Sequence, residues 1–128
     1  MIIINSELLD RLTETAGKTD RLRINHNLHS SADSKSQRLL NALEPGTQIP
    51  IHKHDNTPET YILLRGRMRV VFYDSNNNNI TESAILDLAD GMYGIDIPAG
   101  QLHTVEVLEH GTVIFECKDG PYMPLSRE

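Results

Sequence analysis

The stretch GTQIPIHKHDNTPETYILLRG, residues 46–66, places two histidines and a glutamate between two glycines. Successive side chains of a strand point to opposite faces, so His52 and His54 project on the same side and Lys53 on the other. The sequence DNTP supplies a turn, after which Glu59 opens a second strand and can lie beside both histidines. This pattern predicts an antiparallel hairpin that brings together two imidazoles and one carboxylate. Polar decoration of an exposed strand is the alternative.

A fourth donor follows a second turn signal, in IPAGQLHTVEV, residues 97–107. The segment Pro98–Gly100 makes a tight turn, and His103 begins the next predicted strand. The remaining histidines lie in predicted loops and are weaker candidates: His26, His29 and His110. Imidazole and carboxylate together suit Fe, Mn, Ni, Cu or Zn better than Ca or Mg. The predicted metal ligands are therefore His52, His54, Glu59 and His103.

Length and charge narrow the class of protein. The 128 residues suffice for one domain with its own core. A formal net charge of −6, with no block of Lys or Arg, argues against a surface for nucleic acid or an anionic membrane. The lone Cys117 cannot form an intrachain disulfide, and the apolar start is too short for a signal peptide or membrane span. We expect a small cytoplasmic protein that binds neither nucleic acid nor membrane.

The chain divides into two regimes. From Asn5 to Ala16 apolar residues recur at helical spacing, with Asn5 as N-cap and Gly17 as a stop signal. Residues 18–36 are polar and are interpreted as a loop. We therefore expect one structural domain, with a helix and loop over residues 1–36 and a β-barrel over residues 37–128.

Short strands between turn signals fill the second regime. The predicted strands are Gln37–Leu43, Gln48–Lys53, Glu59–Leu64, Arg67–Tyr73, Ile80–Leu88, Tyr93–Ile97, His103–Val107 and Thr112–Cys117. Many short strands at regular spacing are typical of a β-sandwich or barrel. They leave no room for crossover helices, which argues against a parallel α/β sheet.

The metal-ligand motif resembles a known family signature. Gly46-x5-His52-x-His54-x4-Glu59-x6-Gly66 is similar to the first signature of the cupin superfamily, with every fixed position present. The resemblance implies an all-β fold: a double-stranded β-helix, or cupin jelly roll, here preceded by a short N-terminal helix. It also implies a metal bound by the four residues above.

The second cupin signature is matched less completely. Pro98-x-Gly100-x2-His103 resembles its core, but Gly91 is displaced from the position of the opening glycine. Val107 stands where the closing asparagine is usual. By strand parity Val105 and Val107 share the face of His103, so we expect them to form an apolar side of the pocket.

A narrower resemblance covers most of the chain. The segments RLRINHNLH (residues 21–29), QRLLNALEPGT (37–47) and FECKDGPYMP (115–124) are similar to the WbuC family of cupin fold metalloproteins. That family is associated with polysaccharide (O-antigen) gene clusters, which implies a carbohydrate-related ligand. The resemblance does not supply a reaction.

The polar cluster before the predicted barrel is a candidate substrate-binding segment. Its residues offer guanidinium, amide and imidazole groups to hydroxyl or carboxylate oxygens: Arg21, Arg23, Asn25, Asn27 and His29. We predict a flap over the barrel mouth in which the last four, together with Tyr61, bind substrate. An ordinary solvated loop is the alternative.

Two residues are candidate catalytic groups. Tyr61 shares the face of Glu59, so its hydroxyl can orient a ligand or act as an acid, although a packed core tyrosine is the alternative. Glu116 is a possible general base, but the apolar face of Val113, Phe115 and Cys117 predicts that Cys117 points inward and Glu116 outward. The thiol is interpreted as buried and structural.

Two functional classes fit these observations. The first is a metal-dependent isomerase, epimerase or oxygenase acting on a small carbohydrate-related substrate. The second is a non-catalytic, metal-dependent sugar-binding or sensor module. In either case the expected cofactor is one divalent transition-metal ion (Fe, Mn, Ni or Zn) and the expected ligand is a small, sugar-related molecule. A homodimer is expected because Ile62 and Leu64 offer apolar surface and open sheet edges need cover.

Overall fold

The computed structural model describes residues 1–124. The first element is helix α1, Ser6–Lys18, which begins at the predicted cap, because the side chain of Asn5 accepts a hydrogen bond from the Leu8 amide at 3.0 Å. Its apolar face packs on a sheet through Leu8, Leu9 and Ala16. The predicted N-terminal helix is therefore confirmed, with its end at Lys18.

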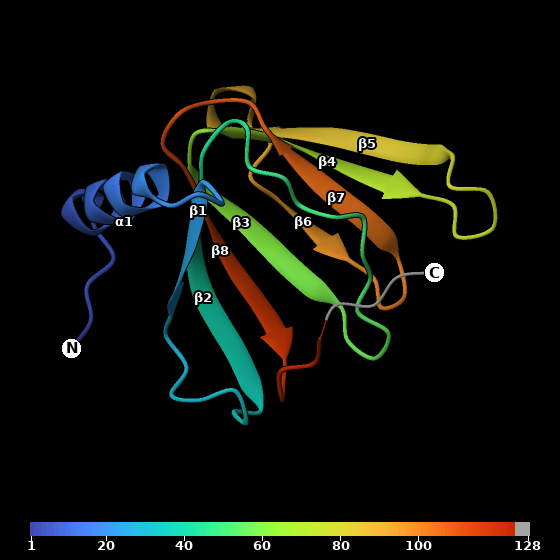
Figure 1. Cartoon of the computed structure of the whole chain (residues 1–128), viewed down its shortest axis with the longest axis horizontal. Helices are drawn as coiled ribbons and strands as arrows, with labels where there is room; N and C mark the ends of the chain where they lie inside the picture. The colour runs from blue at the N-terminus through green and yellow to red at the C-terminus, as the bar shows by residue number, and fades with distance from the viewer. Residues whose placement is uncertain (125–128) are drawn as a thin grey trace.

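Two antiparallel sheets make up the rest of the fold (Figure 1). The strands are β1 (Arg23–Asn27), β2 (Ser36–Leu43), β3 (Glu59–Arg65), β4 (Arg67–Tyr73), β5 (Ile80–Asp87), β6 (Gly94–Ile97), β7 (Leu102–Val107) and β8 (Thr112–Asp119), with a 3-10 turn, η1 (Leu88–Asp90). One sheet has the order β1-β2-β8-β3-β6 and the other β5-β4-β7. The two sheets form two layers (Figure 1), and the connection between β2 and β3 bridges β7 of the smaller sheet through His52.

The predictions for two segments are wrong. The region predicted to be loop contains β1, which pairs with β2 from Arg23↔Leu43 to Asn27↔Leu39 and forms an edge of the larger sheet. The predicted strand Gln48–Lys53 is irregular instead, with a bridge between His52 and His103. Pro50 lacks an N–H group, which limits the ladder that this segment can form.

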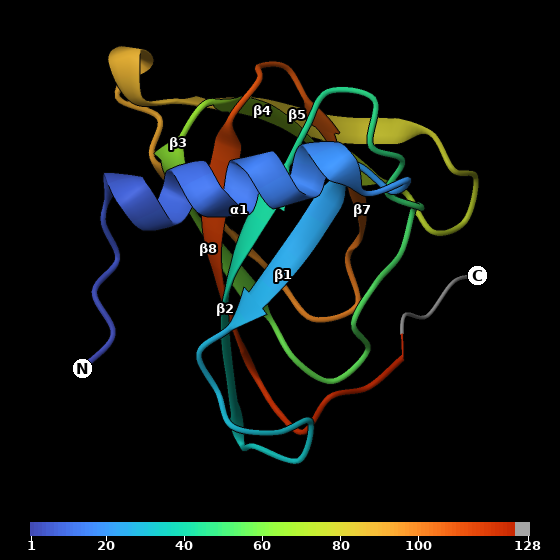
Figure 2. The ribbon, with the colours of Figure 1, turned by 60° about the vertical axis from the view of Figure 1, so that its left-hand side comes forward.

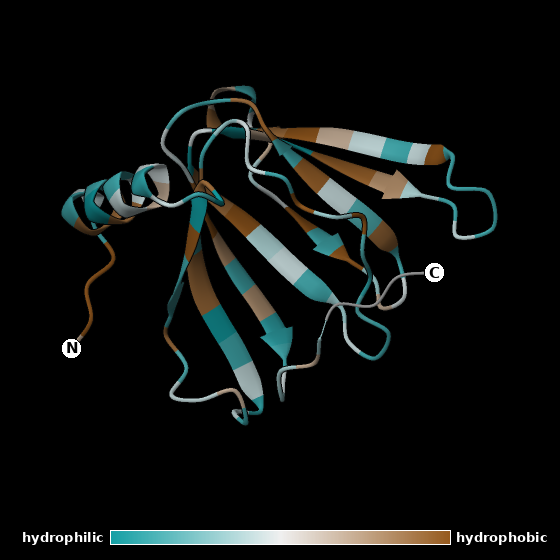
Figure 3. Cartoon of the chain, in the orientation of Figure 1, coloured by the Kyte–Doolittle hydropathy of each residue, from teal (hydrophilic) through white to brown (hydrophobic). Residues whose placement is uncertain are grey.

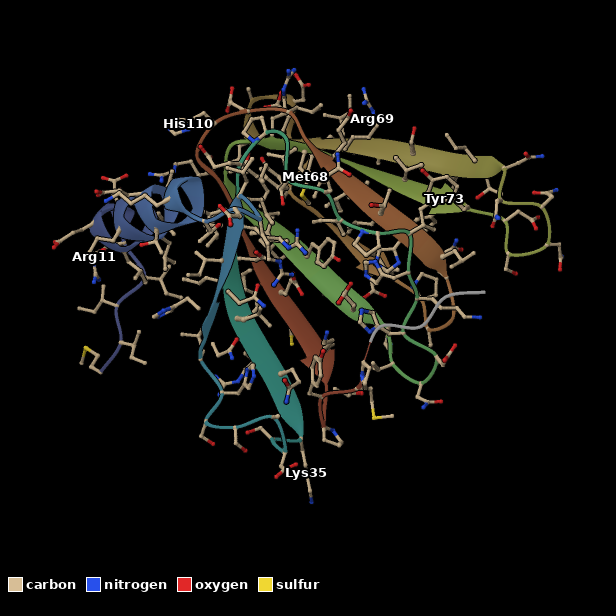
Figure 4. All side chains as sticks on the ribbon, in the orientation of Figure 1. Arg11, Lys35, Met68, Arg69, Tyr73 and His110 are labelled. Carbon is tan, nitrogen blue, oxygen red and sulfur yellow. The ribbon has the colours of Figure 1, made fainter. Side chains whose placement is uncertain are left out.

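Two apolar clusters stabilise the layers. One lies between the sheets and includes Leu43, Leu63, Met68 and Ile114. Figure 4 shows Met68 between the sheets and Arg69, its neighbour on β4, directed away from them. Apolar and polar residues alternate along several strands, as the bands of Figure 3 show, because one face of each strand packs inward.

The second cluster lies under the helix. Figure 2 shows α1 crossing the outer side of β1, β2 and β8. Leu64 packs against this cluster, so only Ile62 of the predicted apolar pair remains strongly exposed, at 41 %. Along residues 1–124, none of the helices has the length and apolar character needed to cross a membrane.

Candidate metal centre and pocket

The four predicted metal ligands lie together although they come from three parts of the chain. One donor atom from each of His52, His54, Glu59 and His103 lies within 4.8 Å of the others. Reciprocal backbone hydrogen bonds of 3.0 and 2.9 Å join His52 to His103 on β7. The amide of Gly100 donates to the carbonyl of His54 at 2.8 Å, and Glu59 is the first residue of β3. Backbone hydrogen bonds from the β2–β3 connection to β7 and to the turn before it therefore position the three histidines.

Backbone carbonyls fix the tautomers of two histidines. Nδ1 of His52 lies 2.8 Å from the carbonyl oxygen of Pro50, and Nδ1 of His103 lies 2.8 Å from that of Gln101. A carbonyl can only accept, so Nδ1 is the protonated nitrogen and Nε2 carries the lone pair in each neutral ring. Metal-binding histidines are commonly oriented by such a bond from their second nitrogen.

The arrangement around Glu59 fits a bound cation. Nε2 of His103 lies 3.3 Å from Oε1 of Glu59, and Nε2 of His54 lies 3.3 Å from Oε2. With the His103 lone pair directed at a carboxylate oxygen, a proton or a metal ion is required between the two. A transition metal suits this set of three imidazoles and one carboxylate.

Protonation of the donors also suits a metal. Burial lowers the pKa of His52 to about 4, although its bond to Pro50 acts in the opposite direction, so the ring is neutral at pH 7. Burial alone would raise the pKa of Glu59, but its close contacts with His103 and His54 and the hydrogen bond from Tyr61 outweigh burial and hold that pKa well below its usual range. Neutral imidazole and ionised carboxylate are the forms that bind metal ions.

The hydroxyl of Tyr61 is hydrogen-bonded to the carboxylate of Glu59. Its hydroxyl donates to Oε1 of Glu59 at 2.6 Å, and the side chain is buried. Burial, and then the negative charges of Glu59 and Glu116, raise the pKa of Tyr61 well above its usual value. The hydroxyl therefore stays protonated and orients Glu59.

A pocket of about 360 Å³ adjoins the cluster. His52, His54 and Glu59 lie in its wall, and the predicted substrate-binding residues line it as well: Arg23, Asn25, Asn27, His29 and Tyr61. Alternate residues of β1 share a face, which is why Arg23, Asn25 and Asn27 all reach the pocket. The predicted flap is thus an edge strand of the larger sheet.

The predicted orientation of Glu116 is wrong. Glu116 is only 9 % exposed, lines the pocket, and lies opposite Tyr61 in the pairing of β3 with β8. The amide of Asn41 donates to its Oε1 at 2.9 Å. Burial and the charge of Glu59 raise the pKa of Glu116 to about 7, despite the opposing bond from Asn41. The inward residue of this pair is therefore Glu116, while Cys117 is half-buried on the other face.

The predicted apolar wall is also corrected. Val105 and Val107 belong to the core cluster between the sheets and do not line the pocket. The aliphatic residues in the lining are Ala32, Leu39, Ile49 and Pro50 instead. The two valines share the face of His103, as strand parity predicts. They are packed in the core between the sheets, however, and not at the pocket surface.

Among the polar pocket residues that sequence reasoning missed, Asn41 and Lys118 lie beside the two carboxylates. Asn41 interrupts an apolar run on β2 and is buried beside Glu116, so a polar residue within that strand was the available signal. The side chain of Lys118 is 14 % exposed, and its Nζ lies 3.7 Å from Oε2 of Glu59. It follows Glu116 on the same face, so the correct phase of β8 would have identified it.

Comparisons with known proteins place the fold. A family model described as "Domain of unknown function (DUF6016)" matches residues 4–86. No curated protein matches the sequence.

Three solved structures illustrate the similarity in fold. The capsular polysaccharide assembling protein CapF from Staphylococcus aureus is 22 % identical with a TM-score of 0.61, over 82 % of this chain and 29 % of that chain. KdgF from Halomonas sp. is 13 % identical with a TM-score of 0.60, over 83 % of this chain and 85 % of that chain. Rru_A2000 from Rhodospirillum rubrum, a cupin-2 domain, is 11 % identical with a TM-score of 0.61, over 83 % and 65 %.

These similarities concern the fold. The chain spans only 29 % of the length of CapF, and all three identities are low. The predicted all-β jelly roll of cupin type with a short N-terminal helix is confirmed. Within it, the His52, His54, Glu59 and His103 cluster could hold a metal ion.

Proposed function

The chain belongs to the family described as a domain of unknown function (DUF6016), and we propose that it is a metal-dependent isomerase or epimerase of small carbohydrate-related substrates. One observation carries the proposal. Glu116 lies in the same pocket as three of the metal-ligand candidates, without being one of them. It supplies the separate proton-transfer group that a binding module would not need.

The surroundings of Glu116 suit proton transfer near neutral pH. Its pKa of about 7 means that both protonation states are populated at pH 7. The bond from Asn41 holds one carboxyl oxygen, which orients the other. A metal ion at the four donors would polarise a carbonyl or hydroxyl oxygen of the substrate.

The side chains of the pocket have separate roles in the proposed reaction. Glu116 accepts a proton from a carbon beside the substrate's carbonyl group. In isomerisation it returns the proton to the neighbouring carbon while a hydroxyl proton moves between the two substrate oxygens, and in epimerisation it returns the proton to the same carbon after the intermediate has turned over. Tyr61 keeps Glu59 in place by its hydrogen bond of 2.6 Å. Asn25 and Asn27 on β1 offer amide groups to substrate hydroxyls from another wall of the pocket.

The carbohydrate assignment rests on the resemblance to the WbuC family and on the lining of the pocket. CapF, a capsular polysaccharide assembling protein, has a similar fold and supports the same direction. Amide and guanidinium groups beside a metal suit small molecules with several oxygen atoms. We therefore propose a sugar or sugar derivative of polysaccharide biosynthesis as the substrate.

Hydrogen exchange tests the reaction class even while the product is unidentified. The metal-loaded protein is incubated in D₂O with aldoses, ketoses and sugar acids, and proton NMR follows the C–H signals beside each carbonyl group. We expect one substrate class to lose such a signal, and Glu116→Gln to slow the loss by about 100-fold or more. Glu82→Gln, an exposed position on β5, is the matched control and keeps the wild-type rate.

Other outcomes identify the alternatives. A sugar that raises the melting temperature but never exchanges hydrogen indicates the non-catalytic binding or sensor module. Oxygen uptake without exchange indicates an oxygenase. Exchange that is unchanged in Glu116→Gln contradicts the role of Glu116.

We also propose that the chain acts as a homodimer. Ile62 is exposed on the outer face of β3, and Ile2, Ile3 and Ile4 precede the helix with large exposed fractions. Figure 3 shows this N-terminal segment as an apolar trace. The edges of the larger sheet at β1 and β6 offer unpaired backbone groups that a second copy can cover.

A further inference from the structure

Arg23 is a half-buried cation that has no acidic partner among the residues that the structure describes. Its Nη1 donates to Oγ1 of Thr47 at 3.1 Å and to the carbonyl of Gln48 at 3.0 Å. Those neutral acceptors hold the guanidinium in place but do not balance its charge. Within residues 1–124, the other half-buried arginines each pair with a carboxylate, Arg65 with Asp10 and Arg69 with Glu106.

A second guanidinium lies close to the first. Arg21 also lines the pocket, and its positive charge, after burial, lowers the pKa of Arg23. Thr47, which accepts from Arg23, donates its hydroxyl to the backbone carbonyl of Arg21 at 2.6 Å, so one side chain holds the Arg23 guanidinium and the backbone of Arg21. Among the described residues, neither arginine forms an ion pair. The two guanidinium groups make one wall of the pocket positive in a chain of net charge −6, and a positive wall attracts anions.

A buried, unpartnered oxygen of Asn41 in the pocket lining is an independent indication of a ligand. Asn41 is 9 % exposed, and its Oδ1 has no hydrogen-bond partner within the described part of the chain. The amide cannot simply be reversed, because its nitrogen donates to Oε1 of Glu116 at 2.9 Å. A buried carbonyl oxygen without a donor is costly, and a hydroxyl group of a ligand would satisfy it.

We propose that the pocket selects an anionic, hydroxylated small molecule, whose carboxylate or phosphate binds Arg21 and Arg23 and whose hydroxyl donates to Asn41. This inference rests on the proposed function and specifies its substrate class. Guanidinium groups bind both anions by charge-assisted, often bidentate hydrogen bonds. A volume of about 360 Å³ suits a ligand of monosaccharide size.

The test measures binding to the metal-loaded protein by calorimetry. The probes are D-glucuronate and D-galacturonate, the corresponding 1-phosphates of glucose and galactose, the two neutral sugars, and adipate as an anion without hydroxyls. We expect one acid or phosphate to bind at least about 10-fold more tightly than its neutral sugar, with affinity falling as salt rises. If the uronates bind more tightly than the sugar phosphates, the anion is a carboxylate; if the sugar phosphates bind more tightly, it is a phosphate.

Matched variants locate the contacts. Arg23→Gln is expected to lower the affinity for the anionic probe by about 10- to 100-fold and to leave the affinity for the neutral sugar unchanged. Arg23→Lys retains the charge and covers the case in which the glutamine variant does not fold. Arg38→Gln, an exposed arginine on the other face of β2, is the control and binds like wild type. Asn41→Leu is expected to lower the affinity for hydroxylated probes by about 5-fold or more and to leave the affinity for adipate unchanged.

Several outcomes would overturn this inference. They are equal affinity for acid and neutral sugar, no binding of any anionic probe, or undiminished anion binding in Arg23→Gln. Binding of an anion with no hydrogen exchange would instead contradict the proposed reaction alone, since affinity is measured without turnover.

Discussion

Glu116 illustrates how a single residue can link stability to function. Its folded-state pKa is about 7 and its ordinary value is 4.5. Between these values the unfolded chain loses the proton while the folded chain keeps it, so stability falls as pH rises from about 5 to about 7 and is level above that. The charged carboxylate that the proposed proton transfer needs is therefore maintained at the expense of stability.

Glu116→Gln tests this linkage. The variant carries no titrating group at that position, so metal-free wild type should lose about 2 kcal/mol relative to it between pH 5 and pH 8. Urea unfolding at each pH gives the difference in unfolding free energy. Glu82→Gln serves as the exposed control with a flat difference. A flat difference for Glu116→Gln as well would show that the carboxyl group has an ordinary pKa.

Tyr61 offers a second prediction about one side chain. Tyr61→Phe removes the hydroxyl that donates to Oε1 of Glu59 but preserves the packed ring. Because such partners orient metal ligands, we expect metal affinity to fall by about 10- to 100-fold, measured by competition with a chromogenic chelator. Tyr93→Phe changes an exposed tyrosine and should leave the affinity unchanged. Equal affinity in Tyr61→Phe and wild type contradicts the orienting role.

Among the elements, those bounded by turn residues were predictable from the sequence. Strand β4 has the predicted bounds, Arg67–Tyr73, because Gly66 and the sequence DSNN mark both ends. Strand β1 was missed because Arg23, Asn25 and Asn27 are polar, and a polar edge strand resembles a loop. Only its pairing with β2 makes it a strand.

Strand β8 shows why the site was only partly predictable. Val113 packs under α1, whereas Ile114 packs between the sheets, so both faces of the strand are apolar. Alternation cannot set the phase of a strand that is covered on both sides. The metal ligands were predictable because His52, His54 and Glu59 lie close together in the sequence and His103 follows a clear turn signal, although His52 bridges β7 instead of forming the predicted hairpin with β3. The Asn41–Glu116 pair depends on tertiary packing.

Helix α1 stabilises the sheet from the side opposite the pocket. Besides its apolar face, it is held by Arg65, which pairs with Asp10 at 2.6 Å and donates to Thr13 at 3.0 Å. We expect Leu8→Ala to lower the unfolding free energy by about 2–4 kcal/mol, because a buried leucine leaves a cavity. Thermal unfolding measures the loss, and the metal content of the folded protein should not change.

A substitution on the exposed side of the helix is the control. Glu14→Ala removes only a surface pair with Lys18, worth about 0.5 kcal/mol or less. A similar loss of stability in both variants, or loss of metal in Leu8→Ala, would show that the helix and the pocket are coupled.

For the whole molecule, the exposed apolar residues predict assembly. Covering Ile62 and the segment Ile2–Ile4 in a symmetric interface removes apolar surface from water. Light scattering at micromolar concentration should give the mass of two chains, and Ile62→Glu should shift it toward one. A wild-type monomer under these conditions contradicts the homodimer.

The bound metal ion is the central claim, because the proposed reaction in this pocket requires it. Elemental analysis of protein purified without added metal measures it most directly. We expect close to one transition-metal ion per chain, and its loss in His52→Ala/His54→Ala, which removes two donors. His26→Ala/His110→Ala, which changes histidines outside the cluster, should keep full occupancy. Wild type without metal, or full occupancy in the His52→Ala/His54→Ala variant, would contradict the account.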